Sequence, residues 1–362
     1  MTRQVASRLP RPFLLMACLA AAVCALPARL GSAQNSQPGS ARSVLRPLRE
    51  APGPAWSHYE TDGHGRTVQV FVAHDRVPKP VVFLLQGSGC SPAFTAEADG
   101  RLDPTSLFQD AVARESSRVH FVMVEKPGVA TVRFTAGMTH AQKVGAFERA
   151  GRQCSPEFFA NATKPVRVTD VLDAIAAVAA QPWARGIILA GHSEGTHVAT
   201  GVLRRAAKGT VAAAGLFASA GPLPFWSGSL SSGGANREAF QAAFDRLRML
   251  QQAPDDFMYQ GLPARRYKTF WIESTPIDDV RDSDVPLFVA QGSRDGTLMA
   301  SDLFALEAVR QQPNRPIRYV VVEGGGHAFD LPDGTSRVDR LFTDFLDWTL
   351  DGNKVTGTSV LK

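Results

Sequence analysis

Residues 186–195 read GIILAGHSEG. The apolar start of this stretch is typical of a strand buried in a parallel sheet, and residues 196–207 follow with a helical pattern. Ser193 therefore lies in a Gly-x-Ser-x-Gly turn that joins a strand to a helix without a spacer. Such a turn carries the hydroxyl clear of the backbone, because the flanking glycines let strand and helix approach closely. An idle serine in a glycine-rich turn is the alternative, but the flanking elements favour a nucleophile.

Strand and helix patterns alternate on both sides of this turn. Strands are predicted at residues 66–74, 81–85, 120–124, 211–218, 286–290 and 317–322. Helices are predicted at about residues 105–115, 166–181, 303–311 and 338–350. Alternation of this kind indicates an α/β fold with a mostly parallel central sheet and helices on both faces.

An insertion interrupts this alternation at residues 222–284. The strands on either side of it are separated by far more chain than the roughly one dozen residues that a crossover needs. The insertion has helical patterning and many large apolar side chains, namely Phe225, Trp226, Phe240, Phe244, Phe257, Met258, Tyr259, Tyr267, Phe270 and Trp271. We expect most of them to form a small core of their own. The functional interpretation is a helical cap over an active site, which would exclude water and shape a pocket.

The pentapeptide around Ser193 and the order of the residues after it resemble the α/β-hydrolase family over residues 66–350. The resemblance implies the α/β-hydrolase fold, with a catalytic acid and then a histidine downstream of the serine. After His197 the sequence contains one further histidine, His327, in a glycine-rich loop behind a predicted strand. We therefore predict that His327 is the base, and we expect no catalytic role for His192 or His197.

The acid of this triad is predicted at Asp295. It follows the strand at residues 286–290 in the sequence GSRDG, which is similar to the acid loop of the family. The family's other acid position, one strand earlier, is empty because no Asp or Glu occurs between Glu194 and Glu238. Asp302, on the next predicted helix, is kept as an alternative. Three acidic residues that precede the strand are interpreted as a solvated charged stretch, namely Asp279, Asp282 and Asp284.

Backbone N–H groups must bind the oxygen of a tetrahedral intermediate. The resemblance implies that Glu194 supplies one of them and that the loop after the second predicted strand supplies another, from Ser88 or Gly89. This chain has Gln-Gly at residues 86–87, where many members of the family have His-Gly. Residues 125–128 (EKPG) follow the next strand at the same edge and are interpreted as a surface loop.

Two cysteines, Cys90 and Cys154, lie beyond residue 33. Thiols in an oxidising compartment commonly pair, so a disulfide between them is predicted, with two separate buried thiols as the alternative. Neither cysteine has another Cys or His at the spacing of a metal site. Acyl transfer through a serine needs no cofactor, and we predict none.

Residues 1–33 are predicted to be a signal peptide. Three arginines precede an uncharged apolar run at residues 13–26, which is shorter than the roughly 20 residues of a spanning helix. Removing the four arginines of this segment lowers the formal net charge from +5 to +1, so we expect no nucleic-acid partner. We also expect no stable membrane insertion of the mature chain and a secreted or periplasmic location. The predicted organisation of the rest is a flexible segment at 34–56 and a hydrolase core at 57–221 and 285–352.

The resemblance implies an esterase-like hydrolase that acts on a small-molecule substrate through a Ser-His-Asp triad and an acyl-enzyme. A serine peptidase or an acyltransferase of the same fold is the first alternative, because pocket shape selects the leaving group. A non-catalytic binding protein is the second alternative. The presence of all three types of triad residue argues against it.

Overall fold

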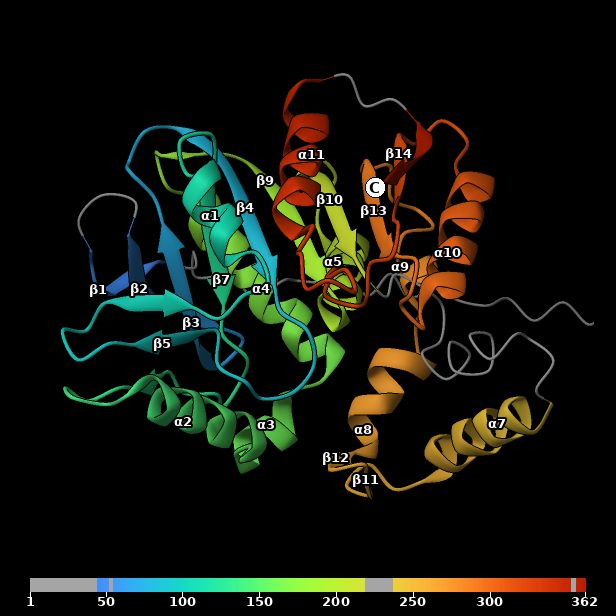
Figure 1. Ribbon diagram of the computed structural model, residues 1–362, viewed down its shortest axis with the longest axis horizontal. Coiled ribbons are helices and arrows are strands. Elements are labelled where there is room, and N and C mark those ends of the chain that lie inside the picture. The colour runs from blue at the N-terminus through green and yellow to red at the C-terminus, as the bar shows by residue number, and fades with distance from the viewer. Residues whose placement is uncertain (1–43, 52–54, 219–236, 353–355) are drawn as a thin grey trace, which may run out of the picture. The chain divides into compact units, whose positions relative to one another are not determined.

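A computed structural model describes residues 44–51, 55–218, 237–352 and 356–362 of the chain. In this part of the chain the largest sheet has ten strands (Figure 1). Across the sheet they are β1 (Arg46–Arg49), β2 (Trp56–Gly63), β3 (Arg66–Ala73), β7 (His120–Val124), β4 (Lys79–Leu85), β9 (Ala184–His192), β10 (Val211–Phe217), β13 (Leu287–Gly292), β14 (Ile317–Val322) and β15 (Gly357–Leu361). From β7 to β15 all neighbours are parallel, whereas β1, β2 and β3 pair in antiparallel fashion. The predicted mostly parallel sheet is confirmed.

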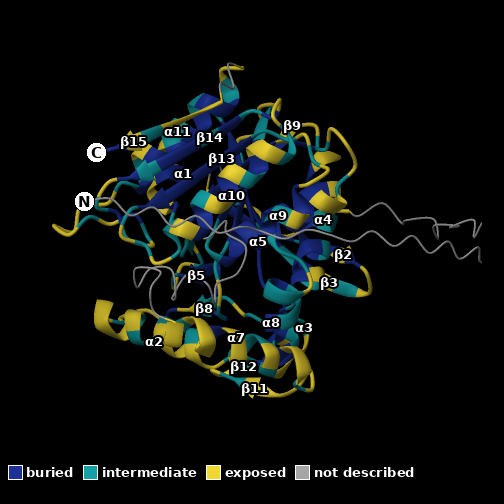
Figure 2. Ribbon diagram, turned by 90° about the vertical axis from the view of Figure 1, so that its right-hand side faces the viewer, coloured by how far each residue is buried: buried dark blue, intermediate teal, exposed yellow. Residues whose placement is uncertain are grey.

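Helices cover both faces of this sheet, because its strands alternate their side chains between two apolar cores. Phe83 of β4 belongs to one core together with residues of α4 (Lys164–Ala179), α5 (Glu194–Arg205) and α10 (Leu298–Gln311). Leu84, the next residue, belongs to the other core with α1 (Gln109–Glu115) and α11 (Val338–Leu350). Successive side chains of a strand point to opposite faces, so nearly every central strand residue is apolar. The central strands are buried along most of their length (Figure 2).

The two ends of the sheet differ from the predicted organisation. Residues 34–56 were predicted to be flexible, but Arg46–Arg49 forms β1 and pairs with β2. The core was predicted to end at residue 352, yet β15 adds a strand beyond it. β1 is exposed throughout and β15 nearly so. Edge strands that bury so little carry almost no alternating apolar pattern, and the sequence therefore does not reveal them.

The segment after β7, for which no helix was predicted before residue 166, contains two helices, α2 (His140–Arg152) and α3 (Pro156–Asn161). Thr139 caps α2 in a reciprocal capping box with Gln142, and Ser155 caps α3. No residue of α2 is buried, so the helix has no apolar stripe for periodicity to detect. A small sheet precedes them and pairs β5 (Phe94–Ala96) with β6 (Leu102–Pro104) and β8 (Val132–Arg133).

The described part of the insertion starts at α7 (Arg237–Gln252). It continues through β11 (Met258–Tyr259), β12 (Leu262–Pro263), α8 (Ala264–Tyr267), the π-helix η1 (Lys268–Ile272) and α9 (Pro276–Asp279). Its small core contains Tyr267, with Tyr259 and Trp271 packed against it. Phe270 instead joins a core of the main sheet, and four of the predicted core residues are exposed, namely Phe240, Phe244, Phe257 and Met258. Phe225 and Trp226 lie outside the described residues, and a cap over the active site stays a prediction.

The predicted signal peptide, residues 1–33, also lies outside the described residues. Across the described ranges, no helix combines the length and the apolar character that a membrane crossing requires.

Candidate active site

Ser193 lies in the tight turn between β9 and α5. Its φ is 54° and its ψ is −123°, a conformation that is rare for residues other than glycine. A Cβ atom at Gly191 would collide with the Gly195 carbonyl group, and one at Gly195 would collide with the Leu85 carbonyl oxygen. Both flanking glycines are therefore required by close approach of the backbone, and the turn has the geometry expected from the sequence.

The structure brings Ser193, His327 and Asp295 together from three separate loops. His327 Nε2 is 3.0 Å from Ser193 Oγ, and His327 Nδ1 is 2.8 Å from Asp295 Oδ2. The alternative acid, Asp302, lies elsewhere and accepts a hydrogen bond of 2.5 Å from the Tyr319 hydroxyl. A hydroxyl, an imidazole and a carboxylate in this sequence can pass a proton from the hydroxyl to the ring.

Hydrogen bonds between neighbouring loops hold the histidine loop, residues 323–329, in place. The Gly324 N–H donates to Ser293 Oγ over 2.8 Å, and the Arg294 N–H donates to the Gly325 carbonyl over 2.8 Å. His192 adds a support that the sequence did not reveal, because its Nε2 lies 3.1 Å from the His327 carbonyl oxygen. Burial lowers the pKa of His192 to about 4. A neutral His192 can therefore support the His327 loop near neutral pH.

The surroundings of Asp295 favour its ionised form. Burial alone would raise the pKa of this carboxyl group, but hydrogen bonds from His327, from the Thr297 N–H and from Gln291 hold it below its usual value. The Thr297 N–H lies 3.0 Å from Oδ1, and Gln291 Nε2 lies 2.6 Å from Oδ2. The Asp295 side chain is 5% exposed whereas that of His327 is 46% exposed. The acid is thus fixed and charged, while the imidazole stays accessible.

The predicted oxyanion donors lie on the other side of Ser193. Glu194 is the first residue of α5, where a backbone N–H has no acceptor within its own helix. The loop after β4 approaches Ser193 at Gly87, where an added Cβ would lie 3.3 Å from Ser193 Cβ. Ser88 and Gly89 follow in the same loop, and the choice between them as donor stays a prediction.

The interpretation of residues 125–128 as a surface loop is wrong for Glu125 and Lys126, which are both buried. Lys126 Nζ donates to the Gly89 carbonyl over 2.8 Å, and Glu125 Oε2 accepts from the Ala93 N–H over 2.7 Å. Both residues thus hold the loop that carries the predicted donors. Burial lowers the pKa of Lys126 and raises that of Glu125. Charged residues directly after a buried strand, at the edge where Ser193 lies, are the signal that could have identified them.

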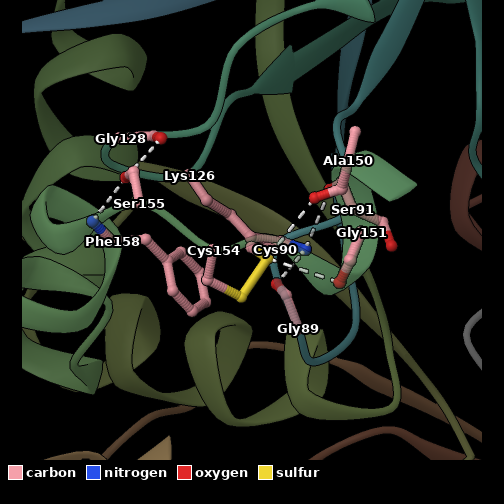
Figure 3. The surroundings of a disulfide bond; sticks show 10 residues. All are labelled: Gly89, Cys90, Ser91, Lys126, Gly128, Ala150, Gly151, Cys154, Ser155 and Phe158. Carbon is pink, nitrogen blue, oxygen red and sulfur yellow. Dashed lines mark hydrogen bonds between the residues drawn. A yellow bond between two sulfur atoms is a disulfide. The ribbon is translucent and has the colours of Figure 1, made fainter. Parts of the chain in front are cut away.

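Cys90 and Cys154 form the predicted disulfide, with an S–S distance of 2.08 Å. The bond ties the loop after β4 to the connection between α2 and α3, where Ser155 caps α3 and donates to the Gly128 carbonyl (Figure 3). Figure 3 also shows the Lys126 side chain passing beside the disulfide toward Gly89. The loop is therefore held both by a covalent bond at Cys90 and by the buried Lys126 side chain at the neighbouring Gly89.

Two further acidic side chains, Glu194 and Asp279, are buried. The Glu194 carboxylate is enclosed by Arg167 and Arg266. Burial alone would raise its pKa, but these two guanidinium groups hold it below its usual value. Asp279 was interpreted as solvated and is instead buried against Lys164 Nζ at 2.5 Å. The interpretation holds for Asp282 and Asp284, which are exposed.

A cavity of about 150 Å³ lies beside the serine turn. Its lining is mixed and includes Gln86, Ser88, Ser106, Phe108, Phe147 and His192. A larger cavity, of about 610 Å³, lies at the far end of α5, and neither cavity is lined by any of the three predicted triad residues. Among the residues that the structure describes, no group of three or more His, Cys, Asp or Glu side chains is arranged to hold a metal ion.

Three solved structures illustrate the fold of this chain. Ferulic acid-bound Est1E from Butyrivibrio proteoclasticus is 14% identical, with a TM-score of 0.50 over 81% of this chain and 98% of that one. Pyrococcus horikoshii acylaminoacyl peptidase is 13% identical, with a TM-score of 0.51 over 85% of this chain and 42% of that one. Porphyromonas gingivalis dipeptidyl peptidase 4 is 14% identical, with a TM-score of 0.50 over 85% and 35%. At these identities the likeness concerns the fold alone.

A comparison with curated proteins found no match. The model of the alpha/beta hydrolase family matches residues 113–338, which is more than half of the chain. That stretch includes the serine turn, the acid loop and the histidine loop. The chain therefore belongs to the alpha/beta hydrolase family.

Proposed function

We propose that this protein is an exported serine hydrolase that cleaves a carboxylic ester by means of Ser193, His327 and Asp295. His327 Nε2 takes the hydroxyl proton as Ser193 Oγ attacks the acyl carbonyl carbon. The same proton then passes to the departing alcohol, which leaves an acyl-enzyme. Water attacks the acyl carbon, with His327 again accepting a proton, and the acid is released as the proton returns to Ser193. Asp295 orients the ring and stabilises its cationic form.

The observation that carries this proposal is the unbroken chain of hydrogen bonds from Asp295 Oδ2 through the His327 ring to Ser193 Oγ. The strained backbone at Ser193 supports it further, because strain of this kind persists where the surrounding structure holds a functional residue in place. The tetrahedral oxygen would be bound by the Glu194 N–H and by Ser88 or Gly89, at a helix start and a loop next to Ser193.

The ester is proposed on the resemblance of the Ser193 pentapeptide and of the order of the triad residues to esterase-like hydrolases. A peptidase or an acyltransferase uses the same triad, and both are outcomes of the test below rather than separate proposals.

A fluorophosphonate probe and a substrate panel test this function. We expect the probe to label the wild type and not Ser193→Ala, and we expect the variant to lose about 10⁴- to 10⁶-fold in kcat on p-nitrophenyl esters of increasing acyl length. Turnover of aminoacyl anilides in preference to the esters would indicate a peptidase. Product transfer to an added alcohol in preference to water would indicate an acyltransferase. A wild type that the probe does not label would point to a non-catalytic binding protein.

Export is proposed on the charge and apolar pattern of residues 1–33. The disulfide supports it, because such bonds persist mainly in oxidising compartments. We expect N-terminal sequencing of protein from the periplasm or the medium to begin at Gln34. An intact N-terminus in the cytoplasmic fraction would contradict the proposal.

A further inference from the structure

The Glu194 side chain is the centre of a buried ionic cluster directly beneath the serine turn. Only 6% of the side chain is exposed. Its Oε1 accepts a hydrogen bond of 2.7 Å from Arg167 Nη1, and its Oε2 accepts one from Arg266 Nη2. Because Glu194 directly follows Ser193, its carboxylate fixes the residue whose N–H would bind the tetrahedral oxygen. The Glu194 side chain is therefore directed into the protein, where it binds two arginines, and not into solvent.

Arg167 connects this cluster to the loop after β4, which carries the second predicted oxyanion donor. Its second terminal nitrogen, Nη2, donates to the Gln86 carbonyl over 3.2 Å. Gln86 immediately precedes Gly87, the residue of the loop that lies against Ser193. One planar guanidinium group therefore spans from the start of α5 to the loop after β4. The fixed fork of arginine sets the distance between its two partners, which the single ammonium group of a lysine cannot do.

Arg266 brings the insertion into the same cluster. It lies in α8 and is itself 5% exposed. Its Nη1 donates to the Ala162 carbonyl over 2.7 Å. The guanidinium carbon lies 5.6 Å from the centre of the Phe158 ring and 5.1 Å from that of Phe270, distances at which a cation is attracted to a ring face. Arg266 is thus held from several sides and has no freedom to move independently of α3 and α5.

We propose that Arg167 and Arg266 are positioning residues. They fix the start of α5 and the loop after β4, which together form the oxyanion site, relative to each other, so that the insertion takes part in catalysis through Arg266. This inference rests on the proposed function. Donors aimed at a developing oxyanion act only when they are preorganised, and misplacement of a reacting group by about 1 Å can cost about 100-fold in rate. Both arginines act through Glu194 or Gln86 and need not touch the substrate.

The test compares Arg266→Met and Arg266→Lys with a matched control, Lys164→Met. The control breaks another buried ion pair, Lys164 with Asp279, which also joins α4 to the insertion but does not contact Glu194 or Gln86. For each protein we would measure kcat per active site, titrated by the fluorophosphonate probe, together with KM for a p-nitrophenyl ester. The affinity for phenylboronic acid, which forms a tetrahedral anion on the serine, would be measured beside the affinity for the product carboxylate.

For Arg266→Met we expect kcat per active site to fall about 10- to 100-fold with KM within about twofold of wild type. Affinity for phenylboronic acid should fall with kcat, while product affinity stays unchanged. Arg266→Lys should recover part of the loss. Lys164→Met should lower the resistance to urea but leave kcat per active site within about twofold.

Three results would overturn the inference. The first is an unchanged kcat per active site in Arg266→Met. The second is an equal loss in Lys164→Met, which would indicate general loosening. If Arg266→Met does not fold, Arg266→Lys is tested in its place. The third result that would overturn the inference is then a kcat per active site in Arg266→Lys equal to that of the wild type. A wild type without ester turnover or labelling would overturn the proposed function as well, which separates the two failures.

Discussion

The two sides of Ser193 are stabilised by different kinds of interaction. On the side of the proposed base, backbone and hydroxyl hydrogen bonds hold the histidine loop, and the His327 side chain is 46% exposed. On the side of the predicted oxyanion donors, a disulfide and the buried side chains of Glu125 and Lys126 hold the loop after β4. An imidazole that gains and loses a proton needs surroundings that tolerate its charge, whereas fixed N–H dipoles work best when they cannot reorganise.

The largest effect is expected on the side of the base. We predict that Asp295→Asn lowers kcat about 10⁴-fold, because an amide no longer stabilises the charged ring and can hold it in the wrong tautomer. The measurement is steady-state turnover of a p-nitrophenyl ester. Asp302→Asn is the matched control, since this carboxylate binds Tyr319 instead, and we expect it to keep wild-type turnover. Equal losses in the two variants would show that Asp295 is not the acid of the triad.

An intermediate effect is expected for the covalent restraint on the other side. The double variant Cys90→Ala, Cys154→Ala should lower the free energy of unfolding by about 2 to 5 kcal/mol, since it removes a bond that closes a long loop. Urea unfolding of wild type and variant measures this loss. Wild-type protein treated with a thiol reductant should behave like the variant. Exported wild type in which mass spectrometry finds both thiols free would contradict the prediction.

The effect that is smallest at neutral pH concerns His192 and His197, and it grows only as the pH is lowered. His197 is buried under the insertion beside the Phe270 carbonyl, and burial lowers its pKa to about 4, as it does for His192. The unfolded chain takes up these protons near the ordinary histidine pKa of about 6.5, whereas the folded protein takes them up only near pH 4. Unfolded protein thus binds more protons between these values, and stability falls as the pH decreases through this window.

We expect the decrease to be about 3 kcal/mol for each histidine across the window. Urea unfolding measured at several pH values would detect it. His197→Gln should flatten part of the profile. An unchanged slope in His197→Gln would mean that His197 is not kept neutral by burial.

Strands and helices with a strong apolar pattern were predictable from local sequence. β7, β14 and α11 have the predicted limits, because each buries a face whose period appears in the sequence. α1 starts later than predicted, at Gln109, since residues 105–108 form a bend and a turn between β6 and the helix. The exposed helix α2 and the edge strands β1 and β15 bury too little to leave a pattern.

Within the candidate site, the sequence predicted those residues for which few residue types and positions suit the proposed chemistry. Ser193 was recognised by its glycines, and His327 was the one histidine that remained downstream. The supporting residues were missed or misread, above all Glu125, Lys126 and the Glu194 side chain. Charged residues are usually exposed, so a local reading assigns them to solvent. Their burial is stabilised only by hydrogen-bonding and charged partners that come from distant parts of the chain.

By itself, the sequence determined the class of fold and predicted the strained serine turn and the three candidate triad residues, because these depend on local periodicity, backbone clearance and residue type. The tertiary structure alone decided how the turn is braced. Arg167 and Arg266 come from segments 99 residues apart in the chain and meet at Glu194 only after the insertion has packed against α4 and α5. Ionic partners at such separations leave no periodic signal, since their pairing depends on three-dimensional distance and burial rather than on spacing along the chain.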